Sequence, residues 1–265
     1  MAEPYWSDGG IALYHGDCRE IMPQLDPASV DLVMTDPPFS VPVKYQDADG
    51  VHPRSWGDLM VMEPFFADVF AKIRRVARKG GQVYVCCDGD TYPVFYKIAY
   101  PMWPQSHMLV WYKPSGRRGR GWLHSHELVL HLRTAETQYA EGFRQDVIGI
   151  MPVRTLHRQH PAEKPGDLWT FLSEGMPKPR YTVLDPFVGA GGVLEWARMR
   201  GHGAIGIEIE ERYCEIAARR LSQAVMLPEP ELTETAVSQD ALLPFHAHRR
   251  AEPQGREAKS AGRDR

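Results

Sequence analysis

YTVLDPFVGAGG, residues 181–192, is the most informative stretch of the chain: an apolar run ends in Asp185 and continues into a glycine-rich turn. Glycines let the backbone turn tightly after a strand and approach a ligand closely. The next apolar run ends in Glu208, 23 residues after Asp185, and a carboxylate at this spacing suits the two hydroxyls of a ribose. No GK[ST] follows the glycines, so the pattern predicts a nucleoside-cofactor site that is not a Walker phosphate loop.

Outside this stretch, apolar runs alternate with helical patterns, which predicts an α/β fold with a mostly parallel sheet. We expect strands at residues 11–14, 30–35, 82–87, 107–111, 127–131, 181–185 and 204–208, and helices at 63–77, 167–174, 192–200 and 211–221. Long loops are expected at 40–58, 113–124 and 134–160. Residues 1–225 therefore form one predicted domain, and residues 226–265, which lack periodicity, a flexible charged tail.

Composition excludes several classes of protein. Hydrophobic residues make up 43% of the 265, enough for a sizeable core, and no apolar run is long enough to span a bilayer. The four cysteines show no CxxC spacing, so we expect reduced thiols in an intracellular protein and neither a disulfide framework nor a zinc site. The net charge of -3 means that any surface for nucleic acid is a local basic patch.

A second motif follows the apolar run at residues 31–35 and reads Asp36-Pro37-Pro38-Phe39. Two consecutive prolines have fixed φ angles and lack N–H donors, so they hold a rigid turn at the end of a strand, where α/β folds bind ligands. The turn would present the Asp36 carboxylate and the Pro37 carbonyl as acceptors beside the flat ring of Phe39. This combination matches an aromatic amine, whose NH2 group donates twice while its ring stacks.

Together these segments resemble the amino-methyltransferase family of DNA, which methylates adenine N6 or cytosine N4. The resemblance covers about residues 10 to 222, and it rests on HGDC at 15–18, TDPPF at 35–39, HPAEKP at 160–165, DPFVGAG at 185–191 and GIEI at 206–209. The catalytic motif precedes the glycine loop, which is the circularly permuted order called the beta class.

The resemblance implies a Rossmann-like, seven-stranded, mostly parallel sheet with helices on both faces, and S-adenosylmethionine as the cofactor. The cofactor-binding residues that it implies are Asp17 near the adenine, Glu208 on the ribose, Asp185, Phe187 and Gly189 near the methionine part with Gly191 in the same loop, and Lys164 closing the pocket. The implied catalytic residues are Asp36, Pro37, Pro38 and Phe39.

The implied reaction is methylation of adenine N6 on a base flipped out of duplex DNA, with the three long loops serving DNA recognition. Asp36 favours adenine, because cytosine enzymes of this order more often carry Ser there, and cytosine N4 remains the alternative. Two rivals stay open: a methyltransferase acting on RNA or protein, and a non-catalytic nucleic-acid-binding relative. We expect a cytoplasmic protein of bacterial or phage origin. The motifs leave open whether it forms a homodimer and whether a cognate restriction endonuclease accompanies it.

The stretch at 113–122 is basic and contains an aromatic residue, Trp122. Arginine pairs with phosphates or with guanine edges, so this stretch is the candidate DNA surface. Its candidate residues are Lys113, Arg117, Arg118 and Arg120. Three histidines follow at 124, 126 and 131, but they lie in a strand-like context, and we expect no metal site there.

Overall fold

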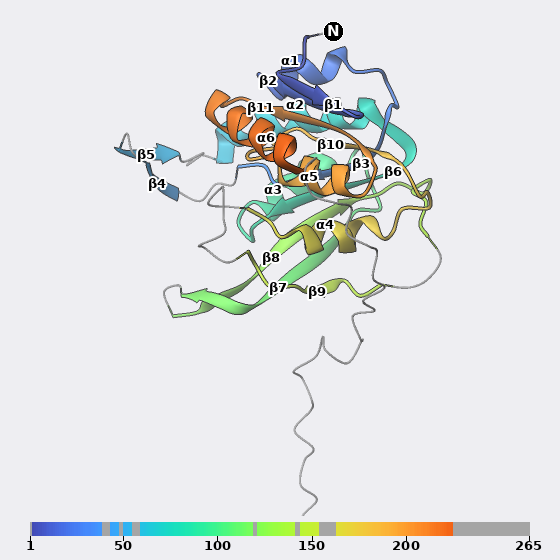
Figure 1. The fold of residues 1–265 in the computed structure, drawn as a ribbon. Coiled ribbons are helices and arrows are strands. Elements are labelled where there is room, and N and C mark those ends of the chain that lie inside the picture. The colour runs from blue at the N-terminus through green and yellow to red at the C-terminus, as the bar shows by residue number, and fades with distance from the viewer. Residues whose placement is uncertain are drawn as a thin grey trace, which may run out of the picture. The chain divides into compact units, whose positions relative to one another are not determined.

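A nine-stranded sheet is the central element of the fold (Figure 1). The computed structural model describes residues 2–38, 43–47, 50–54, 59–118, 121–140, 144–153 and 163–224. The order across the sheet is β1-β2-β11-β10-β3-β6-β8-β7-β9. In chain order these strands are β1 (Trp6–Asp8), β2 (Ile11–His15), β3 (Val30–Thr35), β6 (Ala77–Cys87), β7 (His107–Arg118), β8 (Leu123–Leu132), β9 (Val147–Gly149), β10 (Thr182–Asp185) and β11 (Gly203–Glu208).

The predicted strand count of seven was too low, although all seven predicted strands are present. The two additional strands, β1 and β9, have three residues each and lie at the two edges of the sheet. Strands this short carry no readable alternation of polar and apolar residues. The sheet is mostly parallel, as predicted: only β1 and β8 run against the other described strands.

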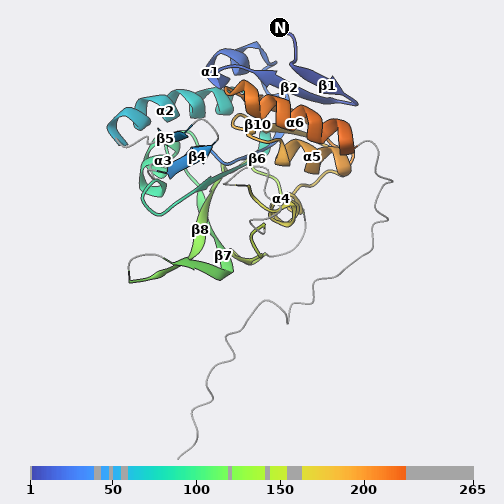
Figure 2. The ribbon, with the colours of Figure 1, turned by 60° about the vertical axis from the view of Figure 1, so that its left-hand side comes forward.

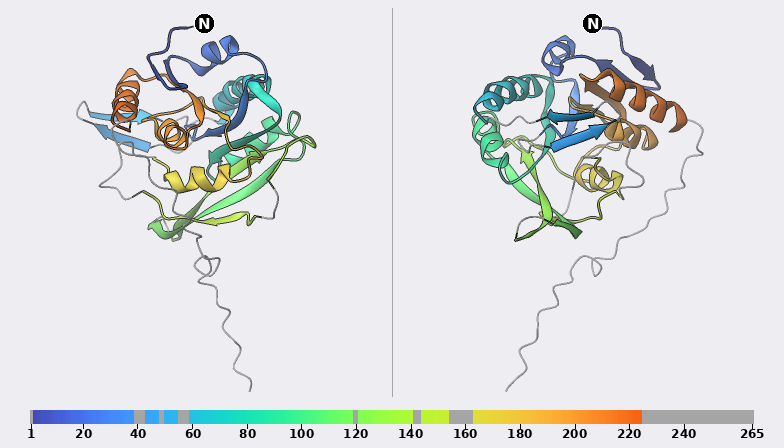
Figure 3. Two further views of the ribbon diagram at one scale, coloured as in Figure 1. Left: turned by 45° about the vertical axis from the view of Figure 1, so that its right-hand side comes forward. Right: turned by 90° about the vertical axis from the view of Figure 1, so that its left-hand side faces the viewer.

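Helices cover both faces of the sheet (Figures 2 and 3). One group contains α1 (Cys18–Ile21), the 3-10 turn η1 (Met22–Gln24), α2 (Leu59–Val76) and α3 (Tyr92–Ala99), and the other contains α4 (Gly166–Ser173), α5 (Gly192–Met199) and α6 (Glu211–Ala224). The four predicted helices correspond to α2, α4, α5 and α6. Helix α3 was not predicted. Its Pro93 lies in the first turn, where the missing N–H costs no hydrogen bond.

Two apolar cores follow from the alternation of side chains along the buried strands. In β3, Val33 faces the core under α2 and α3, whereas Leu32 and Met34 face the core under α4, α5 and α6. Strand β6 divides in the same way, with Val85 in the first core and Cys86 in the second. Successive residues of a strand point to opposite faces, so strands covered on both faces are apolar throughout.

The three predicted long loops contain more strand than expected. Residues 43–47 and 50–54 pair as the antiparallel hairpin of β4 (Val43–Asp47) and β5 (Gly50–Arg54). The stretch 113–124 belongs largely to the hairpin of β7 and β8, and 134–160 contains β9. The predicted tail at 226–265 lies outside the described residues. No helix within the described ranges is both long and apolar enough to cross a membrane.

Gly191 provides a test of the turn between β10 and α5. Its φ is +84°, and a Cβ atom there would lie 2.8 Å from the Cβ of Ala217 in α6. Gly191→Ala should therefore lower the free energy of unfolding by at least about 2 kcal/mol, because both left-handed strain and overpacking oppose it. Urea unfolding of the ligand-free protein measures this difference.

The matched control is Gly192→Ala one residue later. An added Cβ at Gly192 has no neighbour closer than 4.0 Å, the distance to an Arg220 nitrogen, and Gly192 begins a helix. Its stability should be unchanged or slightly higher. Equal stability of the two variants would contradict the strained turn.

Candidate active site

Four neighbouring parallel strands place the predicted acidic residues together, because the carboxyl ends of these strands lie at the same end of the sheet. We call this end the acidic edge. Strands β2, β11, β10 and β3 are adjacent in this order, and they are followed by or end in Asp17, Glu208, Asp185 and Asp36 respectively. After β10 the chain continues to β11, and after β3 it continues to β6 on the opposite side. The strand order thus reverses between β10 and β3, which is where open α/β sheets bind their ligands.

Glu208 holds the glycine loop against the end of β11. One carboxylate oxygen accepts a hydrogen bond from the N–H of Gly189 at 2.9 Å, and the other accepts one from the N–H of Glu210 at 2.9 Å. Each carboxylate oxygen can accept two hydrogen bonds, so the group retains acceptor capacity for a ligand. Burial raises the pKa of Glu208 above its ordinary value.

Asp185 joins the glycine loop to β3. Its Oδ1 accepts hydrogen bonds from the Thr35 hydroxyl at 2.7 Å and from the N–H of Phe187 at 3.0 Å. The side chain is buried, and burial raises the pKa of Asp185 to about 7 in spite of these two bonds. A carboxyl group with this pKa is sensitive to any charge that enters the edge of the sheet.

Asp17 and Phe187 lie toward α2. The Asp17 carboxylate accepts a hydrogen bond from the backbone of Arg19 and pairs with the Arg19 guanidinium at 2.6 Å, and the bond from this side chain lowers the pKa of Asp17. The Arg19 guanidinium lies over the ring of Phe65, 4.7 Å from its centroid, and Phe65 lies 6.2 Å from Phe187. Asp17, which we predicted to lie near the adenine of the cofactor, is therefore held by an ion pair with Arg19.

Asp36, the first residue of the DPPF motif, has its two carboxylate oxygens in different surroundings. Its Oδ2 accepts a hydrogen bond from the Nζ of Lys164 at 2.5 Å. Its Oδ1 is buried and has no hydrogen-bond partner among the described residues. Pro37 is buried and Pro38 is exposed, and Phe39 lies outside the described residues. Burial raises the pKa of Asp36 to about 6, even though Lys164 lowers it.

Lys164 contacts the DPPF motif directly. Its side chain is 5% exposed, and its ammonium lies 3.3 Å from Oε2 of Glu127 as well as against Asp36. Although burial lowers the pKa of Lys164, the carboxylates of Asp36 and Glu127 raise it above its usual value. The preceding residues 160–162 of the HPAEKP element lie outside the described residues.

Sequence reasoning missed Glu127. Strand β8 runs antiparallel to β6, so its amino-terminal part reaches the edge where β3 and β6 end. The only signal in the sequence is a charged residue at the start of the apolar run LVLHL, at 128–132. That signal has no meaning until the position and direction of β8 are known.

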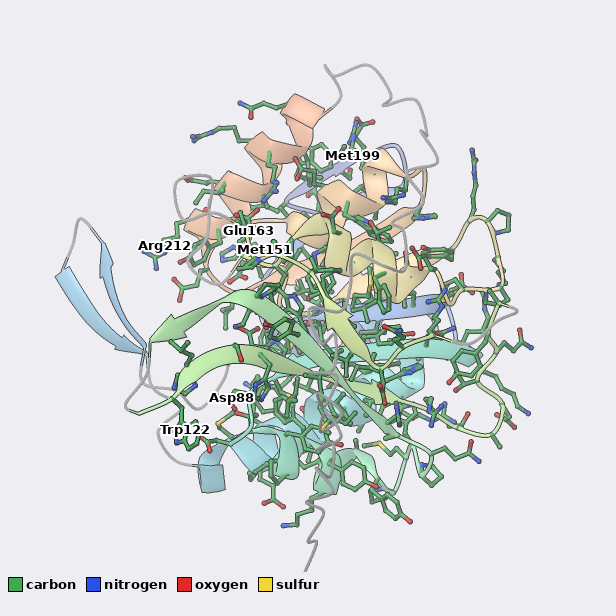
Figure 4. All side chains as sticks on the ribbon, turned by 90° about the horizontal axis from the view of Figure 1, so that it is seen from below. Asp88, Trp122, Met151, Glu163, Met199 and Arg212 are labelled. Carbon is green, nitrogen blue, oxygen red and sulfur yellow. The ribbon has the colours of Figure 1, made fainter. Side chains whose placement is uncertain are left out.

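Of the four candidate DNA residues, only Lys113 has a described side chain. Lys113 points to Glu127, with 2.6 Å between Nζ and Oε1, and its ammonium lies 5.3 Å from the ring centroid of Trp111. Arg117 and Arg118 belong to the end of β7, their side chains are not described, and Arg120 lies outside the described residues. Trp122, at the tip of the hairpin, is 83% exposed (Figure 4).

His131 and the four cysteines lie in surroundings typical of structural residues. His131 is buried and stacks on the ring of Tyr84 at 4.2 Å. The four cysteines are buried and unpaired. Within the described ranges, no group of three His, Cys, Asp or Glu side chains is arranged to hold a metal ion.

Comparison with known proteins identifies the family of the chain. Residues 30–219 match the family described as DNA methylase, the N6 and N4 methyltransferases. One relative, the DNA adenine methyltransferase YhdJ of Escherichia coli (strain K12), is 23% identical over 258 residues, which cover 84% of this chain and 86% of YhdJ.

Two solved structures share the fold. The complex of M1.HpyAVI with SAM has a TM-score of 0.61 and 20% identity, over 80% of this chain and 98% of that chain. The cytosine-N4-specific PvuII DNA methyltransferase has a TM-score of 0.65 and 16% identity, over 91% of this chain and 92% of that chain. Because the family match spans more than half of the chain and the catalytic motif precedes the glycine loop, the chain belongs to the beta class of the S-adenosylmethionine-dependent N6 and N4 DNA methyltransferases.

Proposed function

We propose that this protein transfers a methyl group from S-adenosylmethionine to N6 of an adenine flipped out of duplex DNA. The observation that carries the proposal is the asymmetric environment of Asp36. Lys164 fixes Oδ2, whereas Oδ1 is buried and has no partner among the described residues. A fixed, unpartnered acceptor at the reversal point of the sheet suits an incoming amino group.

The acidic edge of the sheet suits S-adenosylmethionine. This ligand carries a ribose diol, an ammonium and a sulfonium, which are donors or positive charges. Glu208, Asp185 and Asp17 provide carboxylates along the ends of adjacent strands, and we assign Glu208 to the ribose and Asp185 to the methionine part with Phe187, Gly189 and Gly191. In this arrangement Lys164 and the DPPF motif form the side of the site that faces the base.

The residues of the chain would act mainly by orientation. S-adenosylmethionine, when bound, supplies an electrophilic methyl group. Asp36 Oδ1 and the Pro37 carbonyl would accept hydrogen bonds from the amino group, which draws its lone pair out of conjugation with the ring. Pro37 and Pro38 keep these acceptors in place, because their φ angles are fixed. Stacking on Phe39 would complete the base pocket.

Adenine is favoured over cytosine by two observations. Position 36 is Asp, and the relative YhdJ is a DNA adenine methyltransferase. Cytosine N4 is the second candidate, because the PvuII enzyme of the same fold is cytosine-N4-specific. Both bases present an exocyclic amine to the same acceptors, so the product must be identified on DNA.

The wild-type protein should produce N6-methyladenine in duplex DNA, and Asp36→Ala should reduce the rate by about a thousandfold, because a charged acceptor aimed at the transition state is lost. Cofactor affinity should change little in Asp36→Ala. Mass spectrometry of the nucleosides from treated DNA measures product and rate, and calorimetry measures cofactor binding.

The control for Asp36→Ala is Asp26→Ala, which removes an exposed carboxylate and should retain full activity. If the product is N4-methylcytosine, the enzyme is a cytosine-N4 methyltransferase, the second candidate. Near-normal turnover by Asp36→Ala on duplex DNA would overturn the proposed mechanism.

Glu208→Ala should weaken the binding of S-adenosylmethionine. A hydrogen bond to a charged group contributes about 1.5–3 kcal/mol, so the loss of even one bond to the ribose should raise the dissociation constant at least about tenfold. Glu215→Ala, which removes an exposed carboxylate of α6, should bind normally. Equal dissociation constants for the two variants would remove Glu208 from the ribose site.

Replacing Arg117, Arg118 and Arg120 together by Ala should weaken binding to every DNA sequence. If these residues contact phosphates, the slope of log affinity against log salt should fall by about 0.9 for each lost contact. A triple variant at Lys79, Lys97 and Arg180, which are exposed elsewhere, changes the net charge equally. Identical salt slopes for both triple variants would show that only net charge matters.

A further inference from the structure

Four charged side chains alternate in sign from β7 to the DPPF motif. Lys113 Nζ lies 2.6 Å from Glu127 Oε1, Lys164 Nζ lies 3.3 Å from Glu127 Oε2, and Lys164 Nζ lies 2.5 Å from Asp36 Oδ2. The exposed fractions of these side chains are 15% for Lys113, 25% for Glu127, 5% for Lys164 and 19% for Asp36. We call this set the charge chain.

The charge chain has an open end. Removing charges from water is expensive, and a buried ion pair often stabilises a fold less than apolar side chains of similar volume would. Stability alone is therefore a weak reason for four partly buried charges. The chain ends at Asp36 Oδ1, which has no hydrogen-bond partner among the described residues. The charges of the charge chain therefore act on Asp36, whose Oδ1 is the acceptor that faces the base in the proposed function.

Glu163, the residue before Lys164, belongs to a separate set of ion pairs. Glu163 accepts a hydrogen bond from Arg220 of α6 at 2.7 Å, and Arg220 also binds Glu195 of α5 at 2.5 Å. Figure 4 shows Glu163 beside α6. These contacts secure the backbone that carries Lys164. Within the site, its ammonium contacts Asp36 and Glu127.

We propose that Glu127 and Lys113 are positioning residues, which act on the catalytic carboxylate of Asp36 through Lys164. This inference rests on the proposed function of Asp36. Glu127 shares the ammonium of Lys164, so that Lys164 orients Asp36 without cancelling its charge. Lys113 in turn neutralises part of the charge of Glu127. Asp36 would consequently stay a strong acceptor with a fixed orientation.

The ionisation of Asp36 reports on the charge chain. Lys164 and Lys113 lower the pKa of Asp36, whereas burial and Glu127 raise it. Among the described residues, Asp185, Cys86 and Cys87 also interact with Asp36, and burial raises the pKa of all three. The two thiols are therefore neutral near pH 7, whereas Asp185, with a pKa of about 7, responds to the charge of Asp36 and ionises with it.

The test is the pH dependence of kcat/KM for the purified full-length protein on duplex DNA. Activity should rise with pH as Asp36 ionises. Glu127→Gln removes a negative charge, so the acid limb should move about one unit to lower pH, while kcat on the plateau falls about tenfold because Lys164 loses a ligand. Lys113→Gln should move the acid limb about one unit the other way, and the double variant should return it toward the wild-type position.

The controls separate positioning from folding and from the proposed function. Lys79→Gln disrupts an exposed ion pair with Glu136 and should leave the profile unchanged. Glu127→Asp keeps the charge, so it should retain the wild-type limb even if Glu127→Gln is unstable. Shifts in the same direction for Glu127→Gln and Lys113→Gln, or no shifts, would overturn the inference. An inactive wild-type protein would instead refute the proposed function.

Discussion

The hydrogen bond between the Thr35 hydroxyl and the Asp185 carboxylate connects the two halves of the site. Thr35 ends β3 and Asp185 ends β10, so this 2.7 Å contact lies where the strand order of the sheet reverses. It fixes the catalytic motif, one residue after Thr35, relative to the glycine loop, which begins after Asp185. Methyl transfer depends on the alignment of two bound molecules, and misplacement by about 1 Å can cost a hundredfold in rate.

One buried and two partly buried carboxylates make this end of the sheet receptive to positive charge. Burial raises the pKa of Asp36, Asp185 and Glu208 together, and the charges of Asp36 and Glu208 raise that of Asp185 further. A cationic ligand relieves this repulsion and favours the ionised carboxylates. The sulfonium and ammonium of the methyl donor have the required sign. The product loses the sulfonium charge, and the edge would hold it less strongly.

Much of this arrangement could be predicted from local sequence. The apolar runs located the seven longer strands of the main sheet, and the carboxylates at their ends identified one edge, because parallel strands end on the same side. The two short edge strands were missed because three residues show no period. Helix α3 was missed as well. Glu127 escaped for a different reason: only the antiparallel direction of β8 brings it to the catalytic edge.

Lys164 illustrates how one short element can serve both sides of such a site. The family resemblance implied a role beside the cofactor, and the geometry adds a contact with Asp36 on the base side. The two roles are compatible, because the neighbouring residue Glu163 is connected to helices α5 and α6. Glu163 binds Arg220 of α6, and Arg220 binds Glu195 of α5, the helix that follows the glycine loop. Arg220 thus connects α5 with the residue next to Lys164. The order of motifs along the chain hides the contact of Lys164 with Asp36, since residue 164 lies 128 positions from Asp36.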